Sequence, residues 1–307
     1  MPAKYVIIIT TKDVKTNMQP PRYYNSRRAA AVAARPPHRH FKGWHIVVAL
    51  AVLVVAGGMF VQQRAIAAQQ KAAIAAEEAR QQRHAAAIQR IIAADTHDAI
   101  SVAVRNVATG ETEIFGRTSA FPIASTEKIL SALLYYHLVE TDRARLDVKL
   151  GAYPASFQLK TMINISNNDA WYLINDAAGG NAALQAYANR IGIPYQVDGN
   201  LMTASAMTLL LAKLYQGDIL SGIHTRELLS YMQHTNEESM LPAAVPAPLT
   251  LYHKYGELDD TLHDVGLVTD GTAAYAIAIY TKGTSSRAER VATVQQIGKE
   301  IIALCGW

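Results

Sequence analysis

A run of sixteen uncharged residues near the start of the chain, residues 46–61, constrains the fold more than any other feature of the sequence. Trp44 and His45 extend this run, and as an α-helix the whole segment would be roughly 27 Å long, just enough to cross a lipid bilayer. Nine Lys and Arg residues but only one acidic residue lie in residues 1–43, a charge of 9 − 1 = +8. Because the basic flank of such a segment stays in the cytoplasm, we expect an uncleaved anchor followed by an exported region.

Two other interpretations of the apolar run are a cleaved signal peptide and a buried helix of a globular domain. A basic leader of 43 residues is too long for a signal peptide, and the charge asymmetry favours the anchor. We therefore predict four parts, each identified by its composition: a basic cytoplasmic tail (1–43), a transmembrane anchor (44–61), an Ala-rich helical stalk without Gly or Pro (62–94) and an exported domain (95–307).

The charge of the tail accounts for the basic character of the whole chain. The chain has a net charge of +4, so the residues after position 43 sum to 4 − 8 = −4. A nucleic-acid-binding domain needs clustered Lys and Arg on its own surface, and we therefore predict no nucleic-acid partner. The single cysteine, Cys305, permits no internal disulfide, and the ten histidines show no metal-ligand spacing, so no metal site is expected.

Residues 95–307 alternate between strand-like and helix-like patterns. A β-hairpin is expected from residues 100–107 and 111–115 around Thr109-Gly110, and three further strands are expected near the other end. Those three strands are predicted at 249–253, 264–268 and 275–280, and helices at 129–139, 159–165, 170–177, 182–191, 204–214, 226–232 and 286–303. This order predicts an α+β fold in which one antiparallel sheet forms from both ends of the domain, with a helical subdomain inserted.

Ser125 and Lys128 are the first candidates for chemistry. They stand three residues apart at the predicted start of a helix, where side chains at i and i+3 share a face, so a nucleophile could be hydrogen-bonded to its base. The N-terminus of a helix also offers backbone N–H groups to an oxyanion. Alone this pair is weak, because Ser at the start of a helix is usually only an N-cap.

Two further motifs follow in order. Ser166-Asn167-Asn168 lies at the junction of two predicted helices, and Lys254-Tyr255-Gly256 lies on the first strand of the C-terminal group. The set resembles the class A β-lactamases and the wider penicillin-recognising serine hydrolases, whose signature is S-x-x-K, S-D-N and K-T-G. The likeness runs from about residue 94 to the end of the chain, and its third motif has the specific form H-K-x-G-E-L followed by H-D-x-G-x-V.

The resemblance implies an acyl-enzyme mechanism in a cleft between the sheet and the helices, without a cofactor. Ser125 would attack the carbonyl carbon of the substrate, and Lys128, its pKa lowered by burial and by the nearby Lys254, would take the proton. Ser166 would relay a proton to the leaving nitrogen. The backbone N–H groups of Ser125 and Glu257 would form the oxyanion hole.

The resemblance also assigns the binding residues. Asn168 would hold the side-chain amide of the substrate, and Lys254 would attract its carboxylate. Gly256 would leave room for the substrate to approach the strand. Tyr255 replaces the Thr of K-T-G, so a bulky phenol stands where a short hydroxyl usually helps to bind the carboxylate.

Two more departures affect the site. Asn167 replaces the Asp of S-D-N, which we expect to change local hydrogen bonds more than the chemistry. Residues 191–202 occupy the place where class A enzymes carry the Glu that activates the deacylating water, and here the only carboxylate is Asp198, in a predicted Asp198-Gly199 turn. We therefore expect slow deacylation, since general-base help is worth roughly 10²–10⁴ in rate.

Each motif also has a structural interpretation. Ser166 and Asn168 could simply cap a helix, and Lys254 could be a solvated strand residue. His253 and His263 are expected to be surface residues or supports behind the site. Asp264 is expected to be structural. Three ordered motifs on the expected elements nevertheless favour chemistry over coincidence.

The sequence thus predicts a membrane-anchored, outward-facing serine hydrolase acting on β-lactams or on acyl-D-Ala-D-Ala cell-wall peptides. One alternative is a degenerate module that binds peptidoglycan peptides without turnover, which the missing Glu and Tyr255 would allow. The presence of both Lys128 and Ser166 argues against it. Another alternative is a hydrolase of unrelated esters or peptides, which the fold alone does not exclude.

Overall fold

The computed structural model describes residues 43–307, and the predicted basic tail lies outside these residues except for Gly43. The chain divides into two compact units, Met1–Arg64 and Ala65–Trp307. Each unit is described separately below.

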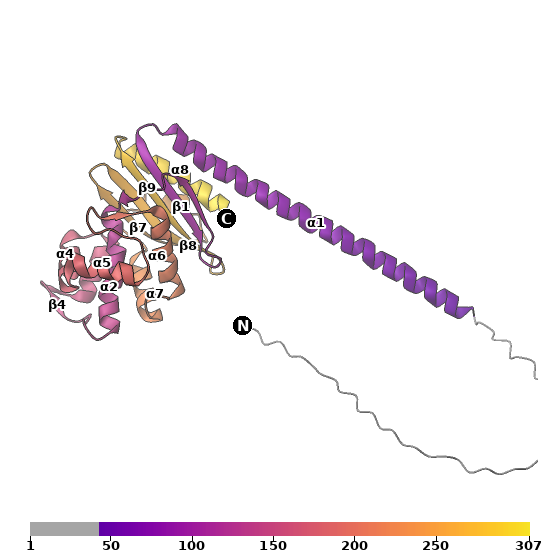
Figure 1. Cartoon of the computed structure of the whole chain (residues 1–307), viewed down its shortest axis with the longest axis horizontal. Helices are drawn as coiled ribbons and strands as arrows, with labels where there is room; N and C mark the ends of the chain where they lie inside the picture. Colours follow the sequence, from indigo (N-terminus) through magenta and orange to yellow (C-terminus); the bar gives the residue numbers. More distant parts are fainter. Residues whose placement is uncertain (1–42) are drawn as a thin grey trace, which may run out of the picture. The chain divides into compact units, whose positions relative to one another are not determined.

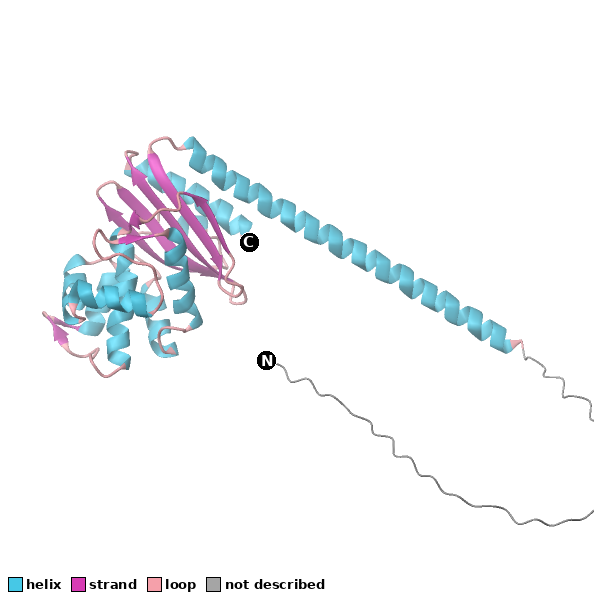
Figure 2. Ribbon diagram, in the orientation of Figure 1, coloured by secondary structure: helices cyan, strands magenta, loops and turns pink. Residues whose placement is uncertain are grey.

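A single helix, α1 (Trp44–Ala94), covers the predicted anchor and the predicted stalk (Figure 2). Its apolar part has a mean hydropathy of 2.4 over 18 residues, and none of that window is buried against protein. By length and composition this helix could cross a membrane. The Ala-rich sequence explains why the helix continues without a break, because Ala has the highest intrinsic helix propensity.

Within the second unit, the last turns of α1 pack against α8 (Arg287–Leu304), the C-terminal helix. Ile88 is completely buried in this contact, and His84 Nδ1 lies 2.7 Å from Glu300 Oε2. The end of the predicted stalk is therefore part of the packed domain.

The central sheet has five strands in the order β2-β1-β9-β8-β7, and each neighbouring pair is antiparallel. The strands are β1 (Asp98–Asn106), β2 (Thr112–Gly116), β7 (Thr250–Leu258), β8 (Thr261–Thr269) and β9 (Ala274–Gly283). Pairing of β1 with β9 joins the two ends of the domain, which confirms the predicted α+β architecture (Figure 1). β7 extends beyond the predicted strand because Lys254 and Gly256 interrupt the apolar pattern that the prediction used.

The sheet separates two hydrophobic cores. Val102 and Ile277 pack on the side of α8, while their neighbours Ala103 and Ala278 pack on the side of the helical block, as the alternation of side chains along a strand requires. The helical block contains α2 (Lys128–Glu140), α3 (Ala155–Asn164), α4 (Asn168–Ala177), α5 (Gly180–Arg190), α6 (Ala204–Gln216) and α7 (Gly222–Tyr231). All six correspond to predicted helices. Along the chain this block lies between β2 and β7, and Figure 1 draws its helices in magenta to orange.

Short elements at the edge of the sheet were not predicted. The two-residue strands β3 (Phe121–Pro122) and β6 (Leu201–Met202) pair with each other, and a 3₁₀ turn, η1 (Ala124–Glu127), follows β3. Ser125 therefore lies in a 3₁₀ turn, and the α-helix begins at Lys128. Ala124 has a φ of +46°, and this left-handed residue introduces the tight turn before the helix.

Candidate active site

A cavity of about 250 Å³ opens where η1, α4 and β7 meet. Four predicted site residues line it: Ser125, Lys128, Asn168 and, on β7, Glu257. The remaining lining residues are Ala124, Glu127, Trp171, Tyr172, Asn200 and Leu258. The structure thus brings together residues that are more than a hundred positions apart in the sequence.

The turn that carries Ser125 is held on two sides. His263 Nε2 donates to Pro122 O at 2.7 Å, while the backbone N–H of Thr281 donates to His263 Nδ1 at 3.2 Å. On the other side, Asn200 Nδ2 donates to Ala124 O at 3.1 Å. These bonds fix the strained backbone before the nucleophile. His263 is fully buried, and burial lowers its pKa to about 4, so this histidine is a neutral support.

Lys128 is nearly buried and is surrounded by oxygen atoms. Its Nζ donates to Ser166 O at 2.6 Å, to Asn168 Oδ1 at 2.7 Å and, more weakly, to Ser166 Oγ at 3.4 Å. The hydrogen bond that the spacing allows between Lys128 and Ser125 is not formed in the described part of the chain, because these three oxygens hold the ammonium group. Burial lowers the pKa of Lys128 to about 8, although the carboxylate of Glu127 opposes the shift.

The second motif places two side chains toward Lys128 and one away from it. Asn167 is the N-cap of α4, since its side chain accepts from the backbone N–H of Ala170 at 2.7 Å. Capping is therefore the role of Asn167, and Ser166 and Asn168 are left to contact Lys128. Ser166 has a φ of +57°, a strained conformation that fits a functional turn.

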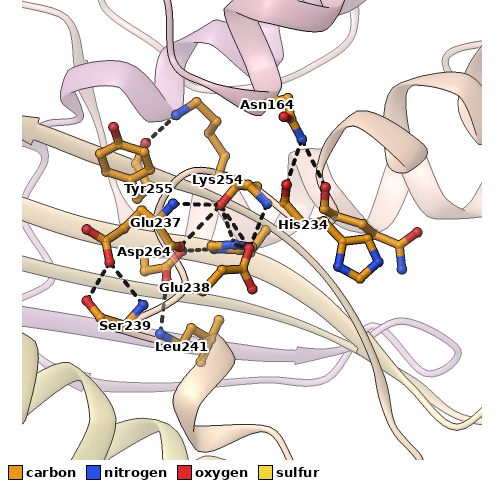
Figure 3. Close-up of polar contacts among 12 residues, drawn as sticks. Asn164, His234, Glu237, Glu238, Ser239, Leu241, Lys254, Tyr255 and Asp264 are labelled. Carbon is orange, nitrogen blue, oxygen red and sulfur yellow. Dashed lines mark hydrogen bonds and ion pairs between the residues drawn. The ribbon is translucent and has the colours of Figure 1, made fainter.

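Lys254 is completely buried, so the interpretation of a solvated strand lysine is wrong. Its Nζ donates to Tyr255 O at 2.8 Å and lies 4.2 Å from the centroid of the Tyr255 ring (Figure 3). Burial and the neighbouring ammonium of Lys128 hold the pKa of Lys254 well below its ordinary value. The repulsion between the two lysines thus lowers the pKa of Lys254, whereas the sequence analysis assigned its effect to Lys128.

Tyr255 lies beside the cavity and does not line it. The ring is half-buried against the core on the α8 side of the sheet, and its hydroxyl lies 3.4 Å from Asn236 Nδ2. The phenol therefore has protein contacts of its own.

The absence of a side chain at Gly256 allows β7 and the turn that carries Ser125 to lie close together. A Cβ atom at this position would lie 3.0 Å from Ile123 O and 3.0 Å from both Thr126 N and Thr126 Cγ2. The missing side chain thus lets the turn that carries Ser125 approach β7. Space for the substrate, the role that the resemblance assigns to Gly256, stays a prediction.

Glu257 reaches the cavity from β7, but its side chain is directed elsewhere. Arg287 Nε lies 3.1 Å from Glu257 Oε2, and both side chains are largely exposed. Because the carboxylate of Glu257 is paired with Arg287, only its backbone N–H would be left for the predicted oxyanion contact, which stays a prediction.

A buried polar network lies behind Lys254. His253 Nδ1 lies 2.9 Å from Asp264 Oδ1, and Asp264 Oδ2 accepts from the backbone N–H of Leu241 at 3.0 Å (Figure 3). Thr235 Oγ1 lies 3.0 Å from His253 Nε2. Although burial opposes it, the charge of Asp264 raises the pKa of His253. His253 and Asp264 are both buried, so they support β7 from behind and are not surface residues.

Six of the ten lining residues were not predicted from the sequence, and among them are Glu127 and Asn200. Glu127 occupies a variable position of the S-x-x-K motif, and Asn200 belongs to the turn in which attention fell on Asp198. Asp198 is exposed and does not line the cavity. Asn200 has a φ of +52° and accepts from Tyr195 Oη at 3.1 Å. The Asp198-Gly199-Asn200 turn was itself the available signal, because Asn is among the few residues that tolerate this conformation.

Comparison with solved structures finds the same fold in penicillin-binding and β-lactamase domains. PBP-A is 24% identical, with a TM-score of 0.65 over 72% of this chain and 94% of the PBP-A chain. TLA-1 extended-spectrum β-lactamase is 19% identical, with a TM-score of 0.68 over 73% and 98%. The last common ancestor of Gram-negative bacteria class A β-lactamase is 22% identical, with a TM-score of 0.66 over 73% and 98%.

A search of curated protein sequences found no match. A sequence model of the beta-lactamase enzyme family matches residues 83–304, which is well over half of the chain. This match includes the last turns of α1, the sheet and the whole helical block. The chain therefore belongs to the beta-lactamase enzyme family, as a serine hydrolase with the class A β-lactamase fold.

Proposed function

We propose that the chain is a membrane-anchored serine hydrolase whose Ser125 forms an acyl-enzyme with β-lactams or with acyl-D-Ala-D-Ala peptides. One arrangement supports this function above all. Ser125, Lys128 and Glu257 line one cavity, so a nucleophile, a base of lowered pKa and a residue proposed to supply a backbone N–H to the oxyanion surround the same space. A mutant of PBP-A, which shares the fold at 23% identity, forms an acyl-enzyme complex with penicillin G.

Acylation begins when Lys128 is neutral. Its amine takes the proton of Ser125 Oγ as that oxygen bonds to the carbonyl carbon of the substrate. The backbone N–H groups of Ser125 and Glu257 receive the negative charge that develops on the carbonyl oxygen. Ser166, whose Oγ lies 3.4 Å from Lys128 Nζ, passes the proton to the leaving nitrogen as the C–N bond breaks.

The substrate is held beside these groups. The side-chain amide of Asn168 contacts the side-chain amide of the substrate. Lys254 attracts the substrate carboxylate, and that carboxylate favours the protonated form of a lysine whose pKa is otherwise held low by burial.

Deacylation is slow under this proposal, so acyl-enzyme accumulates. Residues 191–202 contain no Glu, and Asp198 is exposed away from the cavity. Lys128, acting a second time in its neutral form, is then the remaining candidate among the groups that the sequence predicted for the site.

The test uses the full-length chain in detergent. A fluorescent penicillin should label the protein covalently, and a chromogenic cephalosporin should give a burst of about one equivalent followed by a slow steady rate. Fast turnover without a burst would contradict slow deacylation. Absence of labelling by several β-lactams would contradict the function and favour the module that binds cell-wall peptides without turnover.

The membrane part of the proposal has its own test. The apolar window of α1 and the +8 charge of residues 1–43 support an anchor with the tail inside and the domain outside. A reporter enzyme that works only outside the cytoplasm should show activity when it is fused after Trp307. Activity of a reporter that works only in the cytoplasm would contradict this topology. The thiol of Cys305 is a poor alternative probe, because burial raises its pKa to about 12.

A further inference from the structure

Two carboxylates line the cavity around Ser125, and they differ in their surroundings. Glu257 is largely exposed and paired with Arg287. Glu127 is only 3% exposed and belongs to η1, the same turn that carries Ser125. Of these two carboxylates, Glu127 is thus the one without an ion pair among residues 43–307.

The carboxylate of Glu127 is oriented by its neighbours. Ser131 Oγ donates to Glu127 Oε1 at 2.6 Å, and Trp171 Nε1 in turn donates to Ser131 Oγ at 3.3 Å. The Trp171 side chain also hydrogen-bonds to the carboxylate of Glu127, and Glu127 lines the cavity, where a water molecule can reach it. Ser131 and Trp171 come from α2 and α4, and their hydrogen bonds orient the carboxylate.

The charged and titratable groups that face Glu127 are few. Lys128 is adjacent in the turn, and the charge of Glu127 raises the pKa of Lys128. Tyr195 lies in the segment after α5 and donates to Asn200. Burial and the charge of Glu127 raise the pKa of Tyr195. Glu127 therefore faces residues 191–202, the segment that contains no Glu and whose one carboxylate, Asp198, is exposed and does not line the cavity.

We propose that Glu127 is the general base that activates water for hydrolysis of the Ser125 acyl-enzyme. This inference rests on the proposed function and names the base of its second step. The carboxylate takes one proton from water while the water oxygen bonds to the acyl carbon. The tetrahedral intermediate then collapses, the bond from the acyl carbon to Ser125 Oγ breaks, and the proton returns to Ser125 Oγ as the acid product leaves.

The same surroundings explain slow hydrolysis. Burial raises the pKa of Glu127 to about 7, although Ser131, Trp171 and Lys128 oppose the shift. Only part of the protein therefore carries the carboxylate form near neutral pH, and Oε1 is already engaged by Ser131. Hydrolysis is expected to quicken as pH rises through about 7.

The experiment compares acylation with deacylation in full-length Glu127→Gln. Deacylation, measured as loss of the penicilloyl adduct, should fall by about 10²-fold or more and lose its pH dependence. Acylation should persist with an undiminished burst, because removal of the Glu127 charge favours neutral Lys128. Asp198→Asn is the matched control and should leave both steps unchanged.

Decay of the adduct at the wild-type rate in Glu127→Gln, with the wild-type pH profile, would overturn the inference. If the wild-type protein forms no adduct, the proposed function fails instead, so the two failures are distinct.

A second variant, Ser131→Ala, covers the case in which Glu127→Gln does not label. Because the Ser131 hydrogen bond lowers the pKa of Glu127, its loss should move the midpoint of the deacylation profile to higher pH. An unmoved midpoint would contradict the role of Glu127.

Discussion

On one side of Ser125 lies β7, nine residues of regular strand paired with β8 along its whole length. On the other side lie two irregular turns, and each contains a residue in the left-handed region, Ser166 and Asn200. The strand positions Lys254 and Glu257 by register alone. The turns position their side chains by individual hydrogen bonds, such as those of Lys128 to Ser166 and Asn168.

This difference matters for the chemistry. Repeated backbone pairing holds the strand side, so a substitution there acts mainly through packing. Under the proposed function the turn side holds the groups that exchange protons, and its geometry depends on single contacts. We therefore expect substitutions of the proton-exchanging groups on the turn side to change the rate of acylation more than the stability, and substitutions on the strand side to change both.

The largest effect is expected for Lys128→Ala, which removes the proposed base together with its hydrogen bonds to Ser166 and Asn168. The acylation rate constant for a penicillin should fall by about 10³-fold, within the usual range for a general base. Stopped-flow or gel-based labelling at several penicillin concentrations would measure it. A decrease below about tenfold would mean that another group takes the proton of Ser125.

The pH dependence of acylation tests the same side without a mutation. Lys128 acts in its neutral form, and its pKa is lowered to about 8, so acylation should quicken as pH rises and level off above about 8. Between pH 8 and pH 6 the rate constant should fall by about 50-fold, since about half of Lys128 is neutral at pH 8 and about 1% at pH 6. A flat profile over this range would contradict Lys128 as the base.

Gly256→Ala tests the strand side. The added Cβ would press on Ile123 O and Thr126 N at 3.0 Å, and β7 is too firmly paired to yield, so the turn that carries Ser125 must shift. We expect acylation to slow by about tenfold and stability to fall by about 1–3 kcal/mol, the usual range for overpacking. Chemical denaturation together with labelling kinetics would show both. An unchanged acylation rate would mean that the turn tolerates the displacement.

The smallest effect is expected at Asn200, which ties the 195–202 segment to Ala124. Asn200→Ala loses the bond to Ala124 O and places a Cβ-bearing residue without a polar side chain at φ +52°. A loss of about 1–2 kcal/mol is expected. Asn200→Gly keeps the backbone conformation and loses only the hydrogen bonds, so it should be less destabilised in the same denaturation experiment. Equal losses would show that the conformation of the turn contributes nothing.

The comparison also explains what the sequence could predict. Period-two alternation and turn residues located the five strands, and the three ordered motifs located Ser125, Ser166 and Lys254. Regular elements such as β7 are indicated by a periodic pattern in the sequence. Its exact length was missed because polar site residues interrupt that pattern.

The parts that were missed depend on contacts between distant residues. Asn200 bonds to a residue 76 positions away, and nothing local in the sequence indicates that bond. Glu127 occupies a variable position of its motif, and only its burial and its place on the cavity indicate a role. The packing of the end of α1 on α8 was hidden as well, because an Ala-rich helix has no clear apolar face.

The position of the covalent adduct tests the central claim most directly. After exposure of the full-length chain to penicillin, the intact mass should rise by one ligand mass. Digestion with trypsin should place the added mass on the peptide of residues 118–128, with fragment ions locating it on Ser125. The variant Ser125→Ala should carry no adduct. An adduct on another residue, or one that survives in Ser125→Ala, would contradict the assignment of Ser125 as the nucleophile.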